Sequence, residues 1–220
     1  MSFYYDGIST DEISGLYNRG VLRGITTNLT LINNEKKKQN VTRSEILRPI
    51  VNLAVQFDVP VSIQLESDSI SEMISEGEAL FKEFIDAKKL YIKVPVDFGK
   101  LQVINKLSSL GIKVNATCVT SFSQAQMACE AGASIVSFFW GKMSDQGLDP
   151  FNHVSKFRDW KNSSGYHSVL ILVGSIRQTS SISSAFEAGA NVVTTSYLNW
   201  NNYSDQLLSS VANKIFQDTN

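Results

Sequence analysis

The chain has 220 residues, of which 20 are basic and 21 acidic, so that its formal net charge at pH 7 is −1. This balance gives no electrostatic reason to expect a nucleic-acid or membrane partner. The length favours one domain over residues 1–220 with a core of its own. No apolar run approaches the roughly 20 residues of a membrane span, and residues 1–6 have the pattern of a strand rather than of a secretion leader.

Short apolar runs alternate with longer amphipathic segments along the chain. The runs predict eight β-strands, at 3–6, 24–27, 61–65, 90–94, 113–118, 135–139, 169–173 and 191–194. Helical spacing of apolar residues predicts helices between them, most clearly at 69–88 and 98–110. Gly111, Gly132 and Gly189 stand shortly before predicted strands, where a helix has to end and turn.

The alternation of strands and helices indicates a parallel sheet covered by helices. Eight strands are also the number that closes a barrel, so we favour an α/β fold of the single (β/α)8 TIM-barrel type. An open doubly wound sheet is the alternative, but it usually carries a glycine-rich phosphate loop after its first strand. Here Asp6-Gly7-Ile8-Ser9 follows that strand, without the glycine pattern.

An additional helix is predicted after the last strand, at 204–218. Leu207, Val211 and Ile215 are spaced by four and therefore lie on one face. The simplest interpretation is that this apolar face packs on its own barrel.

The cysteines and histidines point to neither a disulfide framework nor a metal site. Cys118 and Cys129 are too few for either, and we expect both to be free interior thiols in the reducing cytoplasm. His153 and His167 have no neighbours at metal-ligand spacing. We therefore expect no metal and no cofactor.

Polar residues gather near the carboxyl ends of the predicted strands, where the active site of such a barrel lies. Lys93 takes the parity opposite to Ile92 and Val94, and Gln64 takes the parity opposite to its apolar neighbours. The other members are Asp6, Asn28, Asn115, Thr117, Ser137 and Ser175. Their convergence on one place is the functional signal.

Lys93 is the unusual member, because an unpaired lysine is costly to bury in an apolar strand. Either its stem is buried while its ammonium group reaches solvent at the barrel mouth, or the amine is a nucleophile. Desolvation disfavours the ammonium form, lowers the pKa and frees the lone pair to attack a carbonyl. The resulting iminium is an electron sink that weakens the bond between the α and β carbons of a bound ketose.

Five motifs in chain order resemble the short-chain transaldolase and fructose-6-phosphate aldolase family, and the similarity runs from Phe3 to about Tyr197. They are Gly24-Ile25-Thr26-Thr27-Asn28, Tyr91-Ile92-Lys93-Val94-Pro95-Val96, Gly111-Ile112-Lys113-Val114-Asn115-Ala116-Thr117, Ser137-Phe138-Phe139-Trp140-Gly141-Lys142 and Gly174-Ser175-Ile176-Arg177. The resemblance implies a metal-independent barrel enzyme that works through a lysine imine. It also implies a homo-oligomer, a decamer in the short members of the family, in which the helix at 204–218 contacts a neighbour.

The resemblance assigns a role to each polar residue. Lys93 would form the Schiff base, and Asp6 would act as acid and base on the departing or attacking hydroxyl. Gln64 and Thr117 would position the water of imine formation and hydrolysis. The sugar would be held by Asn28, Asn115, Ser137 and Phe139, and its phosphate by Lys142, Ser175 and Arg177.

Most of these roles have a purely structural alternative. Asp6 would cap the following turn, Ser175 would cap the next helix, and Arg177 would form a surface ion pair. Asn115 and Thr117 would be hydrogen-bonded polar groups of the barrel interior.

The chain departs from the family pattern in four ways. Leu29 replaces the proline that usually follows Asn28, Phe138 replaces another proline, and Lys142 replaces an arginine and so loses its bidentate fork. The fourth departure is a mixture of the two branches. Gln64 matches the aldolases, since typical transaldolases have glutamate there, whereas Phe139 matches the transaldolases, since the aldolases have tyrosine.

The missing tyrosine hydroxyl favours one activity over the other. Without it, hydrolysis of the enzyme-bound imine should be slow, which favours a transaldolase of the pentose phosphate pathway type that moves a dihydroxyacetone unit between ketose and aldose phosphates. An aldolase that cleaves fructose 6-phosphate to dihydroxyacetone and glyceraldehyde 3-phosphate is the first alternative. A non-catalytic barrel that binds sugar phosphates or serves in an assembly is the second, and an imine on Lys93 would argue against it.

Overall fold

Eight parallel strands close into a barrel in chain order in the computed structural model, which describes residues 1–204. The strands are β1 (Ser2–Asp6), β2 (Ile25–Thr26), β3 (Val61–Gln64), β4 (Leu90–Pro95), β5 (Val114–Val119), β6 (Ile135–Phe139), β7 (Leu170–Gly174) and β8 (Val192–Thr195). β1 pairs with β8 from Ser2↔Val192 to Tyr5↔Thr195, which closes the ring. The predicted (β/α)8 barrel is therefore confirmed, and the open sheet is excluded.

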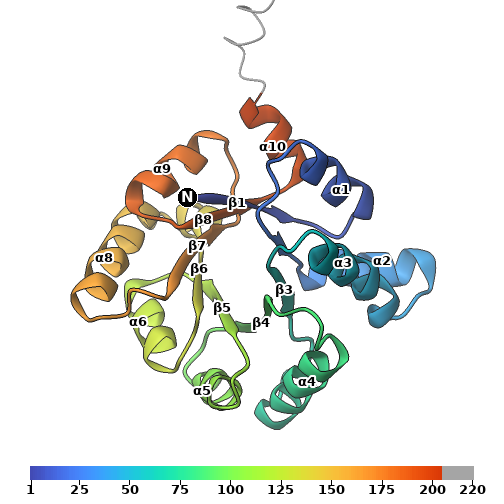
Figure 1. Cartoon of the computed structure of the whole chain (residues 1–220). Helices are drawn as coiled ribbons and strands as arrows, with labels where there is room; N and C mark the ends of the chain where they lie inside the picture. The colour runs from blue at the N-terminus through green and yellow to red at the C-terminus, as the bar shows by residue number, and fades with distance from the viewer. Residues whose placement is uncertain (205–220) are drawn as a thin grey trace, which may run out of the picture.

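Helices connect the strands and form an outer ring around them, as Figure 1 shows. Within residues 1–204 they are α1 (Thr10–Asn18), α2 (Leu29–Gln39), α3 (Arg43–Gln56), α4 (Ile70–Glu83), α5 (Leu101–Ser109), α6 (Phe122–Glu130), α7 (Trp140–Asp145), α8 (Pro150–Ser163), α9 (Ser180–Ala188) and α10 (Tyr197–Ser204). Two connections, β2 to β3 and β6 to β7, each carry two helices. The number of helices therefore exceeds one per strand.

The helix predicted at 69–88 is shorter than its apolar pattern suggests. It begins after Ser69, whose side chain accepts from the Glu72 N–H, and it ends at Glu83. Phe84 leaves helical geometry and is buried in the core. The Ala87 N–H then donates to the Phe84 carbonyl at 2.9 Å, and the chain turns into β4. Burial of Phe84 and Ala87 thus continues the apolar pattern beyond the helix itself.

The barrel interior is filled by side chains toward the end where the strands begin. A small cluster consists of strand residues alone: Tyr4, Ile135, Leu172 and Val192, with Tyr91 and Leu170 packed against them. These residues alternate along their strands with members of the main core between strands and helices. They therefore face the barrel interior. Open space remains at the opposite end, where the strands finish.

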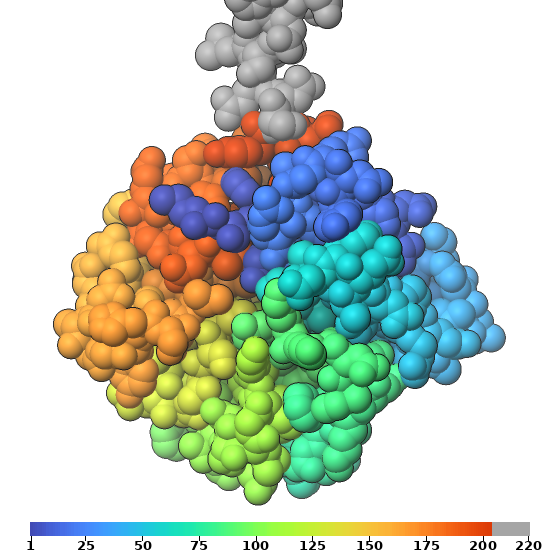
Figure 2. Space-filling view, viewed as in Figure 1, coloured from blue at the N-terminus to red at the C-terminus, as the bar shows by residue number. Residues whose placement is uncertain are grey.

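The first and last described elements lie side by side (Figures 1 and 2). The Phe3 ring lies 5.1 Å from the Trp200 ring and 5.9 Å from the Tyr203 ring, which packs α10 against β1. The helix predicted at 204–218 lies outside the described residues except for Ser204, which ends α10. None of the helices in residues 1–204 has the length and hydropathy needed to span a membrane.

Candidate active site

A cavity of about 450 Å³ opens at the carboxyl ends of the strands. Every one of the eight strands, or the loop that follows it, contributes to its wall. The lining residues are Asp6, Thr26, Asn28, Leu29, Thr30, Gln64, Lys93, Thr117, Cys118, Ser137, Phe139, Lys142, Leu172, Gly174, Ser175, Arg177 and Thr194. Ten of the eleven residues predicted for the site are among them, and the eleventh, Asn115, is not.

A second hollow, of about 390 Å³, lies beside α10 and is lined mostly by apolar side chains such as Phe3, Ile182 and Trp200. Its described lining does not bring together amine, carboxylate and amide groups as the mouth of the barrel does. Converging polar groups in a concave site are the mark of a reaction centre. The cavity at the mouth is therefore the candidate active site.

The Lys93 amine lies at the inner end of this cavity. Its residue is 6% exposed, and Nζ donates to the carbonyl oxygen of Thr27 at 2.8 Å. Burial lowers the pKa of Lys93 below its ordinary value, while the charge of Asp6 acts in the opposite direction. The amine therefore loses its proton more easily than a surface lysine and is available as a nucleophile.

The strand register places Lys93 directly beside residues of the two neighbouring strands. Gln64 pairs with Lys93 across β3 and β4, and Lys93 pairs with Asn115 across β4 and β5. Neighbouring residues of parallel strands at one level lie on the same side of the sheet. The parity argument therefore placed Gln64 and Lys93 correctly, and both line the cavity.

Asp6 lies at the end of β1, where two neighbours hold its carboxylate. Thr26 Oγ1 donates to Asp6 Oδ1 at 3.3 Å, and Asn28 Nδ2 donates to the same oxygen at 3.2 Å. Thr26 is in turn hydrogen-bonded to Thr194 at 2.7 Å. The side chain that caps α1 is Ser9, so Asp6 is not needed as a cap and keeps an oxygen for the cavity.

Asn28 has two roles in the local structure. Its Oδ1 caps α2 by accepting from the Leu31 N–H at 3.0 Å, while its Nδ2 contacts Asp6. The cap holds the amide in one orientation at the cavity wall even though Leu29, rather than proline, follows it.

A bulge in β5 explains why two consecutive residues line the same cavity. The register between β5 and β6 shifts between Ala116 and Val119, and Cys118 has a φ of 62°. Such a bulge redirects side chains that would otherwise alternate between faces. Thr117 and Cys118 therefore both reach the cavity. The strained backbone at Cys118 is of the kind that clusters at functional sites.

Thr117 and Cys118 differ in their contacts. Within the described residues, the buried Thr117 hydroxyl has no hydrogen-bond partner with good geometry, although it lies near enough to the Cys118 thiol to lower the pKa of that thiol. Burial has the larger effect and raises the pKa of Cys118, while Lys93 also acts to lower it. A buried hydroxyl without a firm partner is suited to hold a water or a substrate atom.

Asn115 lies beneath the cavity rather than in its wall. It is fully buried, its Nδ2 donates to Ser62 Oγ at 3.2 Å, and its Oδ1 accepts from Ser137 Oγ at 2.6 Å. The observed contacts make Asn115 a support for Ser137, which does line the cavity. Direct contact between Asn115 and a substrate stays a prediction that these contacts do not favour.

The segments that follow β6 and β7 carry the cationic groups of the mouth, Lys142 and Arg177. Ser175 has a left-handed backbone with a φ of 58°, and its carbonyl accepts from the Gly141 N–H at 2.9 Å. A side chain at position 141 would collide with this carbonyl and with Arg177, so glycine allows α7 to approach the loop after β7. α9 begins only at Ser180, which means that Ser175 does not cap it.

Lys142 and Arg177 are both exposed at the rim of the cavity. Arg177 forms an ion pair with Asp145 at 3.1 Å, with about half of each side chain in water. Within residues 1–204, the side chain of Lys142 has no hydrogen bond or ion pair. The alternative of a surface ion pair at Arg177 is thus observed, and the same residue also lines the cavity.

Sequence reasoning missed several lining residues, notably Thr26, Cys118 and Thr194. Thr26 and Thr194 are polar residues near strand ends, so the argument that found Asp6 would also have reached them. Cys118 had no such signal, because a bulge depends on strand pairing. Among the described residues, no group of three or more His, Cys, Asp or Glu side chains is arranged to hold a metal ion.

Comparisons with known proteins agree with this geometry. The sequence model of the family described as "Transaldolase/Fructose-6-phosphate aldolase" matches residues 3–219. A protein of Chlorobium phaeovibrioides named "Probable transaldolase" is 36% identical over 88% of this chain and 86% of its own length. A protein of the same name from Geobacillus thermodenitrificans is 34% identical over 90% and 87% of the two chains.

Proposed function

Because the chain is a member of the transaldolase/fructose-6-phosphate aldolase family of enzymes, we propose that it transfers a dihydroxyacetone unit between ketose and aldose phosphates through an imine on Lys93. The observation that carries this proposal is the buried amine of Lys93, whose pKa is lowered and which lies in a cavity together with Asp6, Gln64 and Thr117. The names of the two relatives support the same reaction class.

The proposed reaction begins with attack of the neutral Lys93 amine on the ketose carbonyl, which loses water to give a protonated imine. Asp6 then accepts the proton of the hydroxyl two carbons beyond the imine carbon. The bond between this hydroxyl-bearing carbon and the carbon next to the imine breaks. Its electron pair moves toward the imine to form an enamine, and the hydroxyl-bearing carbon leaves as an aldehyde. Addition of a second aldehyde reverses these steps, and Asp6 returns the proton.

Water is needed to form and to hydrolyse the imine. We assign its positioning to Gln64 and Thr117, which line the cavity on either side of the Lys93 strand. The buried Thr117 hydroxyl supports this assignment, since it has no firm partner within the described residues. Gln64 offers both a donor and an acceptor, although it lacks the basicity of a glutamate.

The sugar phosphate would lie between the two sides of the mouth. Ser137 and Phe139 form its wall on β6, Asn28 contacts its hydroxyls, and Lys142, Ser175 and Arg177 bind the phosphate. An arginine and a lysine beside a hydroxyl are suited to a phosphate dianion. The exposed position of both cations supports an anion that projects from the mouth.

Phe139 bears on the choice between transfer and release of dihydroxyacetone. It ends β6, lines the cavity and has no hydroxyl to assist water, which favours transfer. Gln64 favours the alternative, an aldolase that releases free dihydroxyacetone. The two are separated by comparing the rate of transfer to erythrose 4-phosphate with the rate of release from fructose 6-phosphate, and faster release would exclude the transaldolase.

A Phe139→Tyr variant sharpens this comparison. A hydroxyl at this position should speed hydrolysis of the imine, so that release rises relative to transfer. Phe98→Tyr is the matched control, because Phe98 is 83% exposed and lies outside the cavity lining. An unchanged ratio in Phe139→Tyr would remove the argument from the missing hydroxyl.

The imine itself is tested by adding borohydride to the protein with fructose 6-phosphate. The masses of the intact chain and of its Lys93 peptide are then measured by mass spectrometry. We expect a gain of one reduced dihydroxyacetone unit on Lys93. Folded protein that forms no adduct with either fructose 6-phosphate or free dihydroxyacetone would contradict the proposal and favour a non-catalytic barrel. An adduct with dihydroxyacetone alone would keep the chemistry and exclude this ketose phosphate.

Three further features belong to the same proposal. A role in the pentose phosphate pathway follows from the substrates proposed here. A cytoplasmic location is supported by the free thiols of Cys118 and Cys129. A homo-oligomer that uses residues 204–218 stays a prediction, which light scattering on the full chain and on a chain ending at Ser204 would test.

A further inference from the structure

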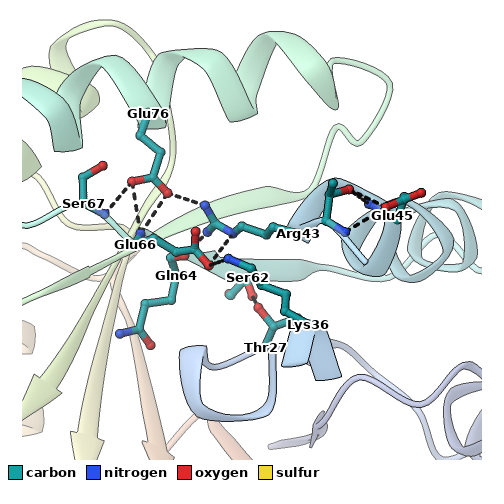
Figure 3. A network of polar contacts seen from close by, with 10 residues as sticks. Thr27, Lys36, Arg43, Glu45, Ser62, Gln64, Glu66, Ser67 and Glu76 are labelled. Atoms are coloured by element: carbon teal, nitrogen blue, oxygen red, sulfur yellow. Dashed lines mark hydrogen bonds and ion pairs between the residues drawn. The ribbon is translucent and has the colours of Figure 1, made fainter. Parts of the chain in front are cut away.

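Two charged residues outside the cavity hold the backbone of Gln64 in place. Arg43, the first residue of α3, donates from Nη2 to the carbonyl oxygen of Gln64 and from Nη1 to Oε1 of Glu76 in α4. Neither Arg43 nor Glu76 lines the cavity. Figure 3 shows the Gln64 side chain pointing away from both of them. The pair therefore reaches the site through the peptide backbone.

Glu76 fixes the loop that follows Gln64. Its carboxylate accepts from the Glu66 N–H at 2.9 and 3.1 Å and from the Ser67 N–H at 2.8 Å. Burial by itself would raise the pKa of Glu76, but these N–H groups and Arg43 together hold the pKa below its ordinary value. The side chains of Arg43 and Glu76 are only 14% and 16% exposed, so solvent weakens this contact less than a surface ion pair.

The shortness of β2 explains why an arginine is needed here. The Thr27 N–H donates to the Ser62 carbonyl at 3.0 Å, and after Thr27 the chain turns into α2. β2 therefore ends before it could supply an N–H to the carbonyl of Gln64, and this partly buried carbonyl is left without a donor from the sheet. Arg43 supplies it from the next helix.

The peptide between Gln64 and Leu65 is held from both sides. Arg43 binds its carbonyl, while the Leu65 N–H donates to the Lys93 carbonyl at 3.1 Å. A rotation of this peptide would change the direction of the Gln64 side chain in the cavity. Small displacements of a positioned group are costly to a reaction that depends on orientation.

We propose that Arg43 and Glu76 are positioning residues that orient the Gln64 amide toward the water of imine formation and hydrolysis. This inference rests on the proposed function, since it needs a water-dependent imine. It places the effect of the pair on the water-dependent steps and not on binding of the sugar phosphate, because neither side chain reaches the cavity.

The same two helices offer a matched control pair. Arg48 of α3 contacts Glu83 of α4 at 2.8 Å, so it joins the same elements with the same charges. Among the described contacts, neither residue bonds to the loop after β3. Removal of this control pair therefore measures the effect of losing an ion pair between α3 and α4 when the contacts of Gln64 stay unchanged.

The test compares Glu76→Gln and Arg43→Lys with Glu83→Gln and Arg48→Lys. We expect the first two variants to lower kcat and the rate of imine trapping about 10- to 100-fold, with KM for fructose 6-phosphate within about twofold of wild type. Arg43→Lys keeps the charge but not the two-pronged contact, so it remains informative if Glu76→Gln folds poorly. The control variants should behave as wild type.

The decisive measurement repeats Glu76→Gln and Arg43→Lys in a Gln64→Ala background. There we expect no further loss, since the group being positioned is gone. An equal loss in both backgrounds would mean that the pair acts through Lys93 or through the fold, and wild-type kinetics in the single variants would likewise overturn the inference. Failure of the wild-type protein to form an imine would instead contradict the proposed function.

Discussion

The two sides of the barrel mouth are built differently. Lys93 and Thr117 on β4 and β5 are buried, and Lys93 is fixed by a hydrogen bond to the backbone. Lys142 and Arg177 stand on α7 and on the loop after β7, and both are exposed. A nucleophilic amine needs a lowered pKa and therefore burial, whereas a cation that binds phosphate has to keep its charge and can remain in water. The contrast separates a side suited to chemistry from a side suited to anion binding.

The largest expected effect is on the buried side. Lys93→Met keeps the length of the side chain and removes the nucleophile, so we expect transfer activity to fall at least about 1,000-fold. Lys161→Met is the matched control, because Lys161 is also buried, at 5% exposure, but lies outside the cavity lining. Activity of both variants is measured by a coupled assay, with circular dichroism to verify folding. Appreciable activity in Lys93→Met would place the nucleophile elsewhere.

Replacement of Asp6 separates imine formation from bond cleavage. We expect Asp6→Asn to lower kcat about 100- to 10,000-fold, the usual contribution of a general acid or base. Trapping of free dihydroxyacetone on Lys93 should survive, because it needs no carbon–carbon cleavage. Equal loss of trapping and of turnover would show that Asp6 acts on the amine instead.

The pH dependence of trapping gives the same variant a second measurement. The neutral amine attacks, so trapping should rise with pH through the lowered pKa of Lys93. The charge of Asp6 acts to raise that pKa. In Asp6→Asn the rise should therefore move to lower pH, and a shift to higher pH would contradict the electrostatic account.

A smaller effect is expected on the exposed side. Arg177→Ala removes a charged donor to the phosphate, and we expect KM for phosphorylated substrates to rise about tenfold. Trapping of free dihydroxyacetone, which has no phosphate, should not change. Arg48→Ala serves as the control, since Arg48 is exposed and outside the cavity. Equal damage to both substrates would mean that Arg177 supports the fold of the loop.

The smallest effect should come from Asp145. A phosphate bound at Arg177 has to share it with this carboxylate, so Asp145→Asn should lower KM for phosphorylated substrates about two- to fivefold, in the range of an exposed ion pair. Asp159→Asn, which breaks the exposed pair with Arg158, is the control. A higher KM in Asp145→Asn would instead identify Asp145 as the group that orients Arg177.

The two sides also differ in how far the sequence predicted them. A lysine within an apolar strand is visible in the pattern because burial makes it exceptional, and the parity of β3 and β4 placed Gln64 and Lys93 in the cavity. Lys142 and Arg177 have no such signal, since exposed cations are common. Their assignment came from motif resemblance. A surface ion pair at Arg177 was foreseen as an alternative, but its partner Asp145 was not.

Elsewhere the predictions departed from the structure where long-range contacts act. The helix at 69–88 ended early because Phe84 turns into the core. The Asn115 amide bonds to Ser62 and Ser137 and lies outside the cavity lining, while its contact with a substrate stays a prediction. Cys118 entered the cavity through a bulge. In each case a neighbouring strand or the core determined the outcome, and neither is contained in a local pattern.

The sequence by itself determined the order of strands and helices, because the burial of apolar residues at periods of two and about 3.6 is a local property. It also identified Lys93, whose charge conflicts with its apolar surroundings. Only the tertiary structure decided which groups meet. The strand register placed Gln64 beside Lys93. Because β2 ends early, the Gln64 carbonyl accepts its hydrogen bond from Arg43 instead. Such contacts depend on where separate strands stop relative to one another, and barrel closure sets that relation.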